Sequence, residues 1–126
     1  MKMPKIKQSE NAVRKAITGY LTLKGWEVFP INNAGTFRGY NKKGEKRFSF
    51  NGTPGVSDLY CIKRKFGEMW IETKATGRKP TLDQEKFITL VNSTPKGVAF
   101  WCDSFDAFLI IYNDIQNGYG LPKSMC

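Results

Sequence analysis

Residues 53–87 read TPGVSDLYCIKRKFGEMWIETKATGRKPTLDQEKF, and this stretch decides the fold of the chain. Residues 58–63 and 68–74 are two mostly apolar segments that predict strands, and a turn at 65–67 would join them as an antiparallel hairpin. A helix is expected next, because Pro80 and Thr81 form a start signal and Pro95 follows its end. Its buried side would be supplied by Phe87, Ile88, Leu90 and Val91.

The flanking segments predict a sheet with helices packed against it. Ser9 is suited to cap a helix that ends at Gly25, because the apolar residues between them recur at helical spacing. Residues 26–31 and 97–102 predict two more strands, and Ser104 opens a last helix. The element order α-β-β-β-α-β-α predicts an α/β fold, a mixed central β-sheet flanked by helices, in a single domain over residues 1–126.

The composition indicates the class of partner. The chain has 126 residues, with 20 Lys plus Arg against 11 Asp plus Glu, which gives a net charge of +9. This excess favours a polyanionic partner. Histidine is absent, which excludes imidazole metal sites and histidine-dependent catalysis. Any hydrolysis must therefore depend on carboxylates, lysine and a hard metal ion.

Two further features indicate the compartment. The longest apolar run, residues 107–112, is too short to span a membrane, and the first residues lack the apolar segment of a signal peptide. The three cysteines, Cys61, Cys102 and Cys126, are widely spaced and form no C-x-x-C pair. We expect a cytoplasmic protein with reduced thiols, in a bacterial or phage-infected cell, and no membrane partner.

Residues 32–57 form a long connection that predicts a basic loop or hairpin arm turning at Lys43 and Gly44. Its cations are interleaved with aromatic residues, and cations contact phosphates while aromatic rings stack on bases. A solvated charged hairpin with aromatic side chains packed beneath it has the same composition. The candidate nucleic-acid contacts of the arm are Arg38, Lys42, Lys43, Lys46 and Arg47.

Three charged residues lie in and around the two central strands. Glu72 and Lys74 point to the same side, because side chains alternate along a strand. If residues whose numbers sum to 132 or 133 are paired, Asp58 lies near Lys74 and its carboxylate converges with that of Glu72. Crowded carboxylates favour a cation between them, and oxygen-only ligands select Mg²⁺ or Mn²⁺. An ordinary cross-strand salt bridge on an exposed face is the alternative.

Two residues from the helices are further candidates for this site. Glu10 lies on the inward stripe of the first helix, where it could also simply compensate the helix dipole. Gln84 stands three residues after Thr81, which is the spacing of a capping box, and it also lies on the inward face of its helix. These two interpretations of Gln84 are compatible, because a helix N-terminus is itself a phosphate-binding place.

The segments GVSDL (residues 55–59), IETK (71–74) and TLDQ (81–84) resemble the PD-(D/E)XK nuclease superfamily, and within it the VRR-NUC (virus-type replication-repair nuclease) family standing alone. This resemblance implies a restriction-endonuclease-like core and a catalytic set of Glu10, Asp58, Glu72, Lys74 and Gln84. Glu10, Asp58 and Glu72 would be the metal ligands and Lys74 the catalytic lysine. Arg78 and Lys79, which follow the E-x-K motif, would join the arm in contacting nucleic acid.

The resemblance implies a Mg²⁺- or Mn²⁺-dependent DNA nuclease that acts on branched, junction or flap DNA. Similarity in plan to junction resolvases implies a homodimer, for which residues 107–120 could supply a face, although a core helix is the commoner use of such a segment. The alternative is a non-catalytic nucleic-acid-binding protein on the same scaffold, which would bind DNA in a salt-dependent way without cutting it.

Overall fold

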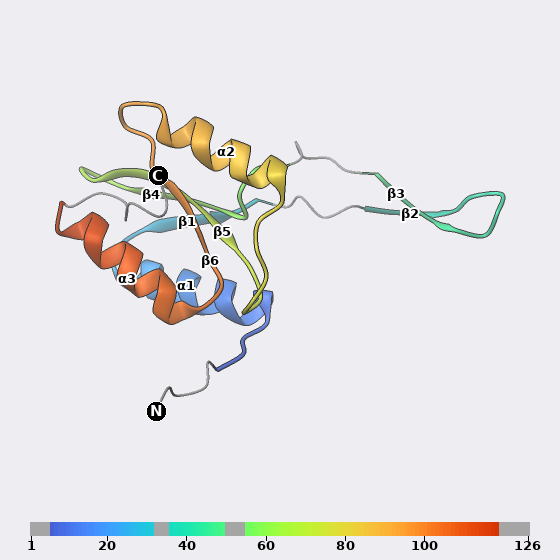
Figure 1. Ribbon diagram of the computed structural model, residues 1–126, viewed down its shortest axis with the longest axis horizontal. Helices are drawn as coiled ribbons and strands as arrows, with labels where there is room; N and C mark the ends of the chain where they lie inside the picture. The colour runs from blue at the N-terminus through green and yellow to red at the C-terminus, as the bar shows by residue number, and fades with distance from the viewer. Residues whose placement is uncertain (1–5, 32–35, 50–54, 119–126) are drawn as a thin grey trace.

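The computed structural model describes residues 6–31, 36–49 and 55–118, with residues 36–38 and 47–49 described by their backbone alone. Helices and strands alternate along the chain (Figure 1). Their bounds are α1 Glu10–Leu23, β1 Glu27–Pro30, β2 Thr36–Tyr40, β3 Lys46–Ser49, β4 Leu59–Lys63, β5 Gly67–Thr73, α2 Leu82–Asn92, β6 Ala99–Cys102 and α3 Phe105–Gln116.

A four-stranded sheet in the order β1-β4-β5-β6 forms the centre of the structure. β4 is antiparallel to both of its neighbours, β1 and β5, and β6 runs parallel to β5. Helices α1 and α3 cover one face and α2 lies over the other (Figure 1). The expected α/β class, a mixed sheet with flanking helices, is confirmed.

The core lies between the sheet and the α1–α3 pair. Side chains that alternate along β4, β5 and β6 contact the apolar stripes of the two helices, and all of the largest members are less than 2% exposed. They include Val13, Ile17 and Leu21 of α1, Leu59, Met69, Ile71 and Phe100 of the sheet, and Phe108 of α3. Cys61 and Cys102 are buried free thiols in the same core, as the sequence predicts.

Strand register differs from the expected one. Leu59 pairs with Ile71, so the numbers of paired residues sum to 130 rather than 132 or 133. The turn occupies residues 64–66, with Lys65 at a positive φ of 69°, and Gly67 already belongs to β5. The turn is thus one residue earlier than predicted. Continuing this register places Asp58 across from Glu72 instead of beside Lys74.

The inner face of α2 was predicted correctly except at Leu90, which is 66% exposed. Residues 84, 87, 88 and 91 follow the i, i+3, i+4, i+7 spacing of one helix face. Leu90 lies two residues, about 200°, from the buried Ile88 and therefore points away from the sheet.

The segment between β1 and β4 contains a hairpin of β2 and β3, which confirms the predicted turn around Lys43 and Gly44. Asn41 organises the turn, because its Oδ1 accepts hydrogen bonds from the backbone N–H groups of Lys43 and Glu45. In Figure 1 this hairpin extends away from the sheet and the helices. Among the helices described, none combines the length and apolar character needed to cross a membrane.

Candidate functional site

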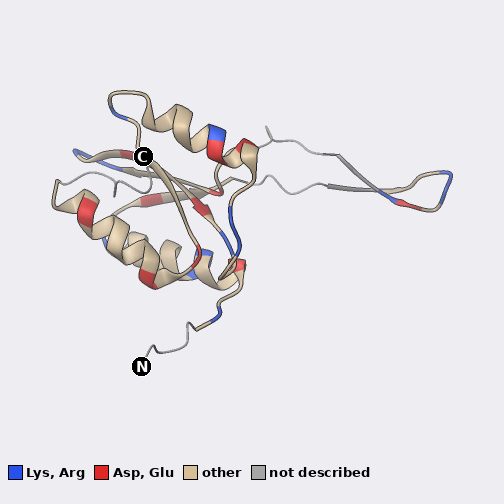
Figure 2. Cartoon of the chain, in the orientation of Figure 1, with Lys and Arg blue, Asp and Glu red and all other residues tan. Residues whose placement is uncertain are grey.

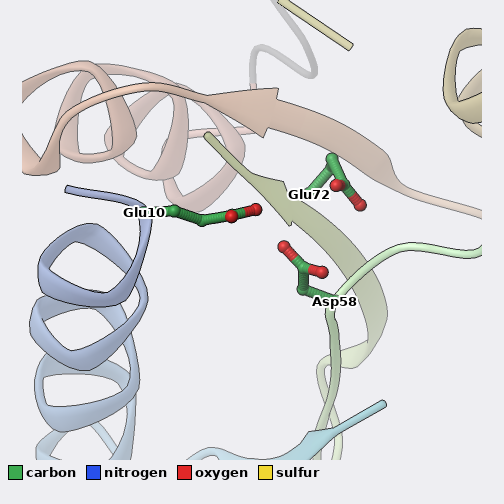
Figure 3. Close-up of side chains that lie close together, drawn as sticks. All are labelled: Glu10, Asp58 and Glu72. Atoms are coloured by element: carbon green, nitrogen blue, oxygen red, sulfur yellow. The ribbon is translucent and has the colours of Figure 1, made fainter. Parts of the chain in front are cut away.

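Three carboxylates meet at one end of the central strands, where β4 begins and β5 ends (Figure 3). We call Glu10, Asp58 and Glu72 the acidic cluster. Glu10 is the first residue of α1, Asp58 directly precedes β4, and Glu72 lies near the end of β5. Each offers an oxygen atom, and these three atoms lie within 4.8 Å of one another. Residues far apart in the sequence are therefore brought together at the place that the spacing predicted.

Glu72 is the unusual member of this cluster, because its side chain is only 1% exposed. Its Oε1 accepts a 2.8 Å hydrogen bond from Nε2 of Gln84, and Nζ of Lys74 lies 3.6 Å from the same oxygen. Its Oε2 is buried and has no hydrogen-bond partner among the residues that the structure describes. Such an atom is costly to bury unless something else contacts it. The arrangement differs from a salt bridge on an exposed sheet face.

The electrostatic setting raises the pKa of Glu72 to about 8. Burial is the main cause, since it disfavours the charged form. The negative charge of Asp58 adds to the effect, the positive charge of Lys74 opposes it, and Glu10 adds a smaller increase. The positive charge of Lys74 is therefore too small to keep the pKa of Glu72 near its ordinary value of 4.5.

Asp58 is held in place by the next strand. Its Oδ2 accepts hydrogen bonds from the backbone N–H of Thr73 at 3.0 Å and from Thr73 Oγ1 at 2.7 Å. Both bonds use Oδ2, so Oδ1 takes no part in them. The backbone carbonyl of Asp58 also accepts a 2.7 Å hydrogen bond from Ile31 N–H, which fixes the start of β4 against the end of β1.

The loop before Asp58 packs against the first turn of α2. Gly55 has a φ of +91°, and a Cβ added there would lie 2.5 Å from the backbone oxygen of Asp83. Only glycine permits this conformation and this close approach. Gly55 therefore gives the chain a tight turn shortly before Asp58.

Glu10 is exposed at the start of α1, and a set of hydrogen bonds among three loops fixes its helix. Gln8 N–H donates to Thr76 Oγ1 at 2.9 Å, and Thr76 Oγ1 donates to the backbone oxygen of Asp103 at 2.9 Å. Gln8 Oε1 accepts from Phe105 N–H at 3.1 Å. The start of α1, the loop after β5 and the start of α3 are thereby joined.

Gln84 has both of the roles that its sequence position suggested. Its backbone N–H donates to Thr81 Oγ1 and its side-chain Oε1 accepts from Thr81 N–H, which forms the capping box of α2. The remaining amide group, Nε2, is the donor to Glu72. One side chain thus joins the cap of the helix to the buried carboxylate.

The cations of the predicted nucleic-acid surface lie in two places (Figure 2). Arg78 and Lys79 are exposed on the loop that follows β5, six and seven residues after Glu72. Lys42, Lys43 and Lys46 are exposed around the hairpin turn, at its far end from the sheet. Arg38 and Arg47 lie in β2 and β3, but their side chains are outside the described residues.

The predicted catalytic set of Glu10, Asp58, Glu72, Lys74 and Gln84 does come together, whereas the hairpin lysines are a separate group. Sequence reasoning missed Thr73, Gln8 and Thr76, which hold the carboxylates in position. Thr73 is the middle residue of the E-x-K motif, and its β-branched hydroxyl next to an acid was the available signal. Gln8 and Thr76 had no signal, because they meet only after the chain has folded.

The donor set fits a hard divalent cation. The three carboxylates supply oxygen atoms alone, and oxygen ligands suit Mg²⁺ and Mn²⁺. Glu72, whose buried Oε2 lacks a hydrogen-bond partner among the described residues, is a member of this cluster. A cation there would give this atom a partner and would offset the repulsion among the acids. The site residues therefore carry more negative charge than Lys74 neutralises.

Comparison with known proteins adds no family assignment: no family model matches the chain, and no curated protein matches it significantly. The likeness to the VRR-NUC family thus depends on the identity and spacing of the site residues alone.

Proposed function

We propose that this chain is a divalent-metal-dependent DNA nuclease whose site consists of Glu10, Asp58, Glu72, Lys74 and Gln84. The observation that carries the proposal is the buried Glu72 carboxylate within a cluster of three acids. Gln84 and Lys74 contact one of its oxygens, while the other has no hydrogen-bond partner in the described part of the chain. The large majority of buried side-chain oxygens in proteins have a hydrogen-bond partner, so a ligand for this oxygen is expected.

The chain's own residues divide the work in a way that suits phosphodiester hydrolysis. Gln84 and the Thr73 backbone orient Glu72 and Asp58, so that their free oxygens are available to a cation. A Mg²⁺ or Mn²⁺ ion held by the three carboxylates would polarise the phosphate and lower the pKa of a bound water. Lys74 lies beside Glu72 with its side chain 15% exposed, so its ammonium group can contact an anionic oxygen of the substrate.

The proposed substrate follows from charge. The net charge of +9 favours a polyanion, and Arg78 and Lys79 are exposed on the loop that joins β5, the strand of Glu72, to α2. The lysines of the hairpin turn would extend the contact to more distant phosphates. Contacts of this kind bind the DNA backbone and do not distinguish one base sequence from another. Recognition of DNA shape is therefore part of the proposal, with branched or flap DNA preferred.

A cleavage panel tests the proposal. Labelled four-way junction, 5′ flap, duplex and single-stranded DNA would each be incubated with Mg²⁺, Mn²⁺ or EDTA. We expect divalent-dependent products that Glu72→Ala and Lys74→Ala abolish while DNA binding is retained. Glu85→Gln is the matched control, because Glu85 is an exposed acid on α2 next to Gln84 and its loss should leave cutting unchanged.

The outcomes separate the alternatives. Symmetric cuts in the junction would support a dimeric resolvase, and cuts confined to flaps or single strands would keep the site without the dimer mechanism. Cutting by pure Glu72→Ala protein at the parent rate would refute the assignment of the site. Salt-dependent binding without any product would favour a non-catalytic binding protein.

A further inference from the structure

A row of aromatic rings crosses the sheet on the face that carries α2. Phe29 of β1 pairs with Tyr60 of β4, and Tyr60 pairs with Trp70 of β5, so the three rings stand side by side on neighbouring strands. Ring centroids are 6.4 Å apart between Phe29 and Tyr60 and 4.4 Å apart between Tyr60 and Trp70. Phe87 of α2 contacts Trp70 edge-on at 5.2 Å. We call these four rings the aromatic row.

The two ends of the aromatic row differ. Phe87 closes one end from the helix above the sheet. The other end is Phe29, which lies on the edge strand of the sheet and is 48% exposed. The ring next to it, Tyr60, is packed against Trp70 on its other side. Phe29 is therefore an exposed aromatic ring whose position is fixed by its neighbours.

The aromatic row lies directly beside the acidic cluster. Trp70 and Glu72 are two residues apart on β5, so they share a face at a separation of roughly 7 Å along the strand. The Glu72 carboxylate is on that face, since it accepts its hydrogen bond from α2. On β1, Phe29 is two residues before Ile31, whose N–H binds the backbone of Asp58. A DNA strand bound at the carboxylates would thus pass Phe29, the exposed end of the aromatic row.

We infer that Phe29 stacks on an unpaired base of the DNA strand that is bound at the carboxylate cluster. This inference deepens the proposed nuclease function and rests on it. A base inside a duplex has neighbours on both faces, whereas a base in a flap or single strand has a free face for an aromatic ring. The substrate class is therefore DNA with unpaired bases next to the scissile phosphate, rather than intact duplex.

The charged residues around the aromatic row suit a DNA strand whose phosphates lie toward the acidic cluster and whose bases lie on the other side. Lys74 lies on the side of the row that faces the acidic cluster, where the phosphates would run. Glu27 and Glu68 lie on the opposite side, two residues before Phe29 and Trp70 on their strands, and they share the same sheet face. These two acids repel phosphates and can accept hydrogen bonds from base amino groups. The backbone and the bases are thereby directed to different sides.

Fluorescence of 2-aminopurine tests the inference without depending on cleavage. Single-stranded and 5′-flap DNA, each with one 2-aminopurine at successive positions near the branch, would be titrated with full-length protein in EDTA. The variants are Phe29→Ala, Phe29→Tyr and, as a matched control, Phe66→Ala. Phe66 is 46% exposed and packs edge-on against Trp26 at the β4–β5 turn, at the opposite end of the strands.

We expect quenching at one position with the parent protein, its loss in Phe29→Ala, and its return in Phe29→Tyr. Affinity for flap and single-stranded DNA should fall about 5- to 100-fold in Phe29→Ala, which is the range for one lost base–aromatic stack, while duplex affinity stays unchanged. Phe66→Ala should behave like the parent.

Cleavage of the same DNA with Mg²⁺ separates this inference from the proposed function. Equal quenching and equal flap affinity in the parent and Phe29→Ala would overturn the stacking role, even if the parent cuts normally. A parent that quenches through Phe29 but gives no product would retain the stacking site and refute the nuclease. An equal loss of affinity for duplex and flap in Phe29→Ala would also overturn the inference, because it would indicate a general loss of structure.

Discussion

Replacing Glu72 by Gln should make the metal-free protein more stable at alkaline pH. The pKa of Glu72 is raised from 4.5 to about 8 in the folded chain. A raised carboxyl pKa means that folding favours the protonated form. The stabilising effect of that proton is complete below pH 4.5 and is lost as the pH rises through about 8. Glutamine resembles the protonated carboxyl group and has no charge to bury.

The size of the effect follows from the interval between the two pKa values. That interval sets a ceiling of about 5 kcal/mol on the stability lost by the parent between acid and alkaline pH. Local rearrangement and water entry reduce such costs in real proteins. We therefore expect Glu72→Gln to exceed the parent by about 1–3 kcal/mol at about pH 8, and to equal it within about 1 kcal/mol at about pH 5.

Urea unfolding in EDTA, followed by the fluorescence of the three tryptophans, measures this difference. Glu85→Gln serves as the control, because it removes an exposed charge from α2 and should stay within about 1 kcal/mol of the parent. Adding Mg²⁺ should stabilise the parent and leave Glu72→Gln nearly unchanged. If Glu72→Gln loses stability relative to the parent as the pH rises, the buried carboxylate is not the source of unmet charge that we infer.

Three further predictions concern the residues that position the carboxylates, each measured by urea unfolding. Gln84→Ala should lower the free energy of unfolding by about 1–3 kcal/mol, and by more than Thr81→Ala does, because it removes the bond to the buried carboxylate as well as the cap. Equal losses in the two variants would mean that the bond has no net effect. Gly55→Ala should cost about 1–3 kcal/mol, since the added Cβ meets the Asp83 carbonyl oxygen at a positive φ; unchanged stability would show that the loop rearranges freely. Thr76→Val should cost about 1–3 kcal/mol by breaking its bonds between loops, and its cleavage rate should fall in parallel; a normal rate would show that the start of α1 keeps its position without them.

Much of the fold was predictable because its signals are local. Ser9, Thr81 and Ser104 each cap the helix that was expected to begin after them. The alternation of side chains in residues 58–63 and 68–74 predicted the two strands, and the side shared by Glu72 and Lys74 followed from it.

The errors arose where one residue or one angle decides the outcome. Register depends on whether the turn begins at residue 64 or 65, and the positive φ of Lys65 is not visible in the sequence. Leu90 was assigned to the inner face because it lies in an apolar run, although its helical angle places it on the outside. The bonds among Gln8, Thr76 and Asp103 link three loops, so no local pattern indicates them.

The geometry of the fold accounts for why the acids gather at this edge of the sheet. β4 begins and β5 ends there, because the two strands are antiparallel. The connection from β5 to the parallel strand β6 brings the N-terminus of α2 to the same edge, where Gln84 contacts Glu72. Helix α1 also begins there, with Glu10 as its first residue. The N-termini of two helices, which are the positive ends of their dipoles, therefore lie near the carboxylates.

These dipoles are too weak to balance the charge of the cluster. Each stabilises a nearby negative charge by about 0.3–1 kcal/mol, and up to about 2 kcal/mol when partly buried. Three carboxylates with Lys74 beside Glu72 leave a net negative charge, which adds to the larger effect of burial in raising the pKa of Glu72. A bound divalent cation would remove it and would also bring the phosphate of a substrate to this edge. The stability of the metal-free protein and the chemistry of the site are thus two consequences of the same unbalanced charge.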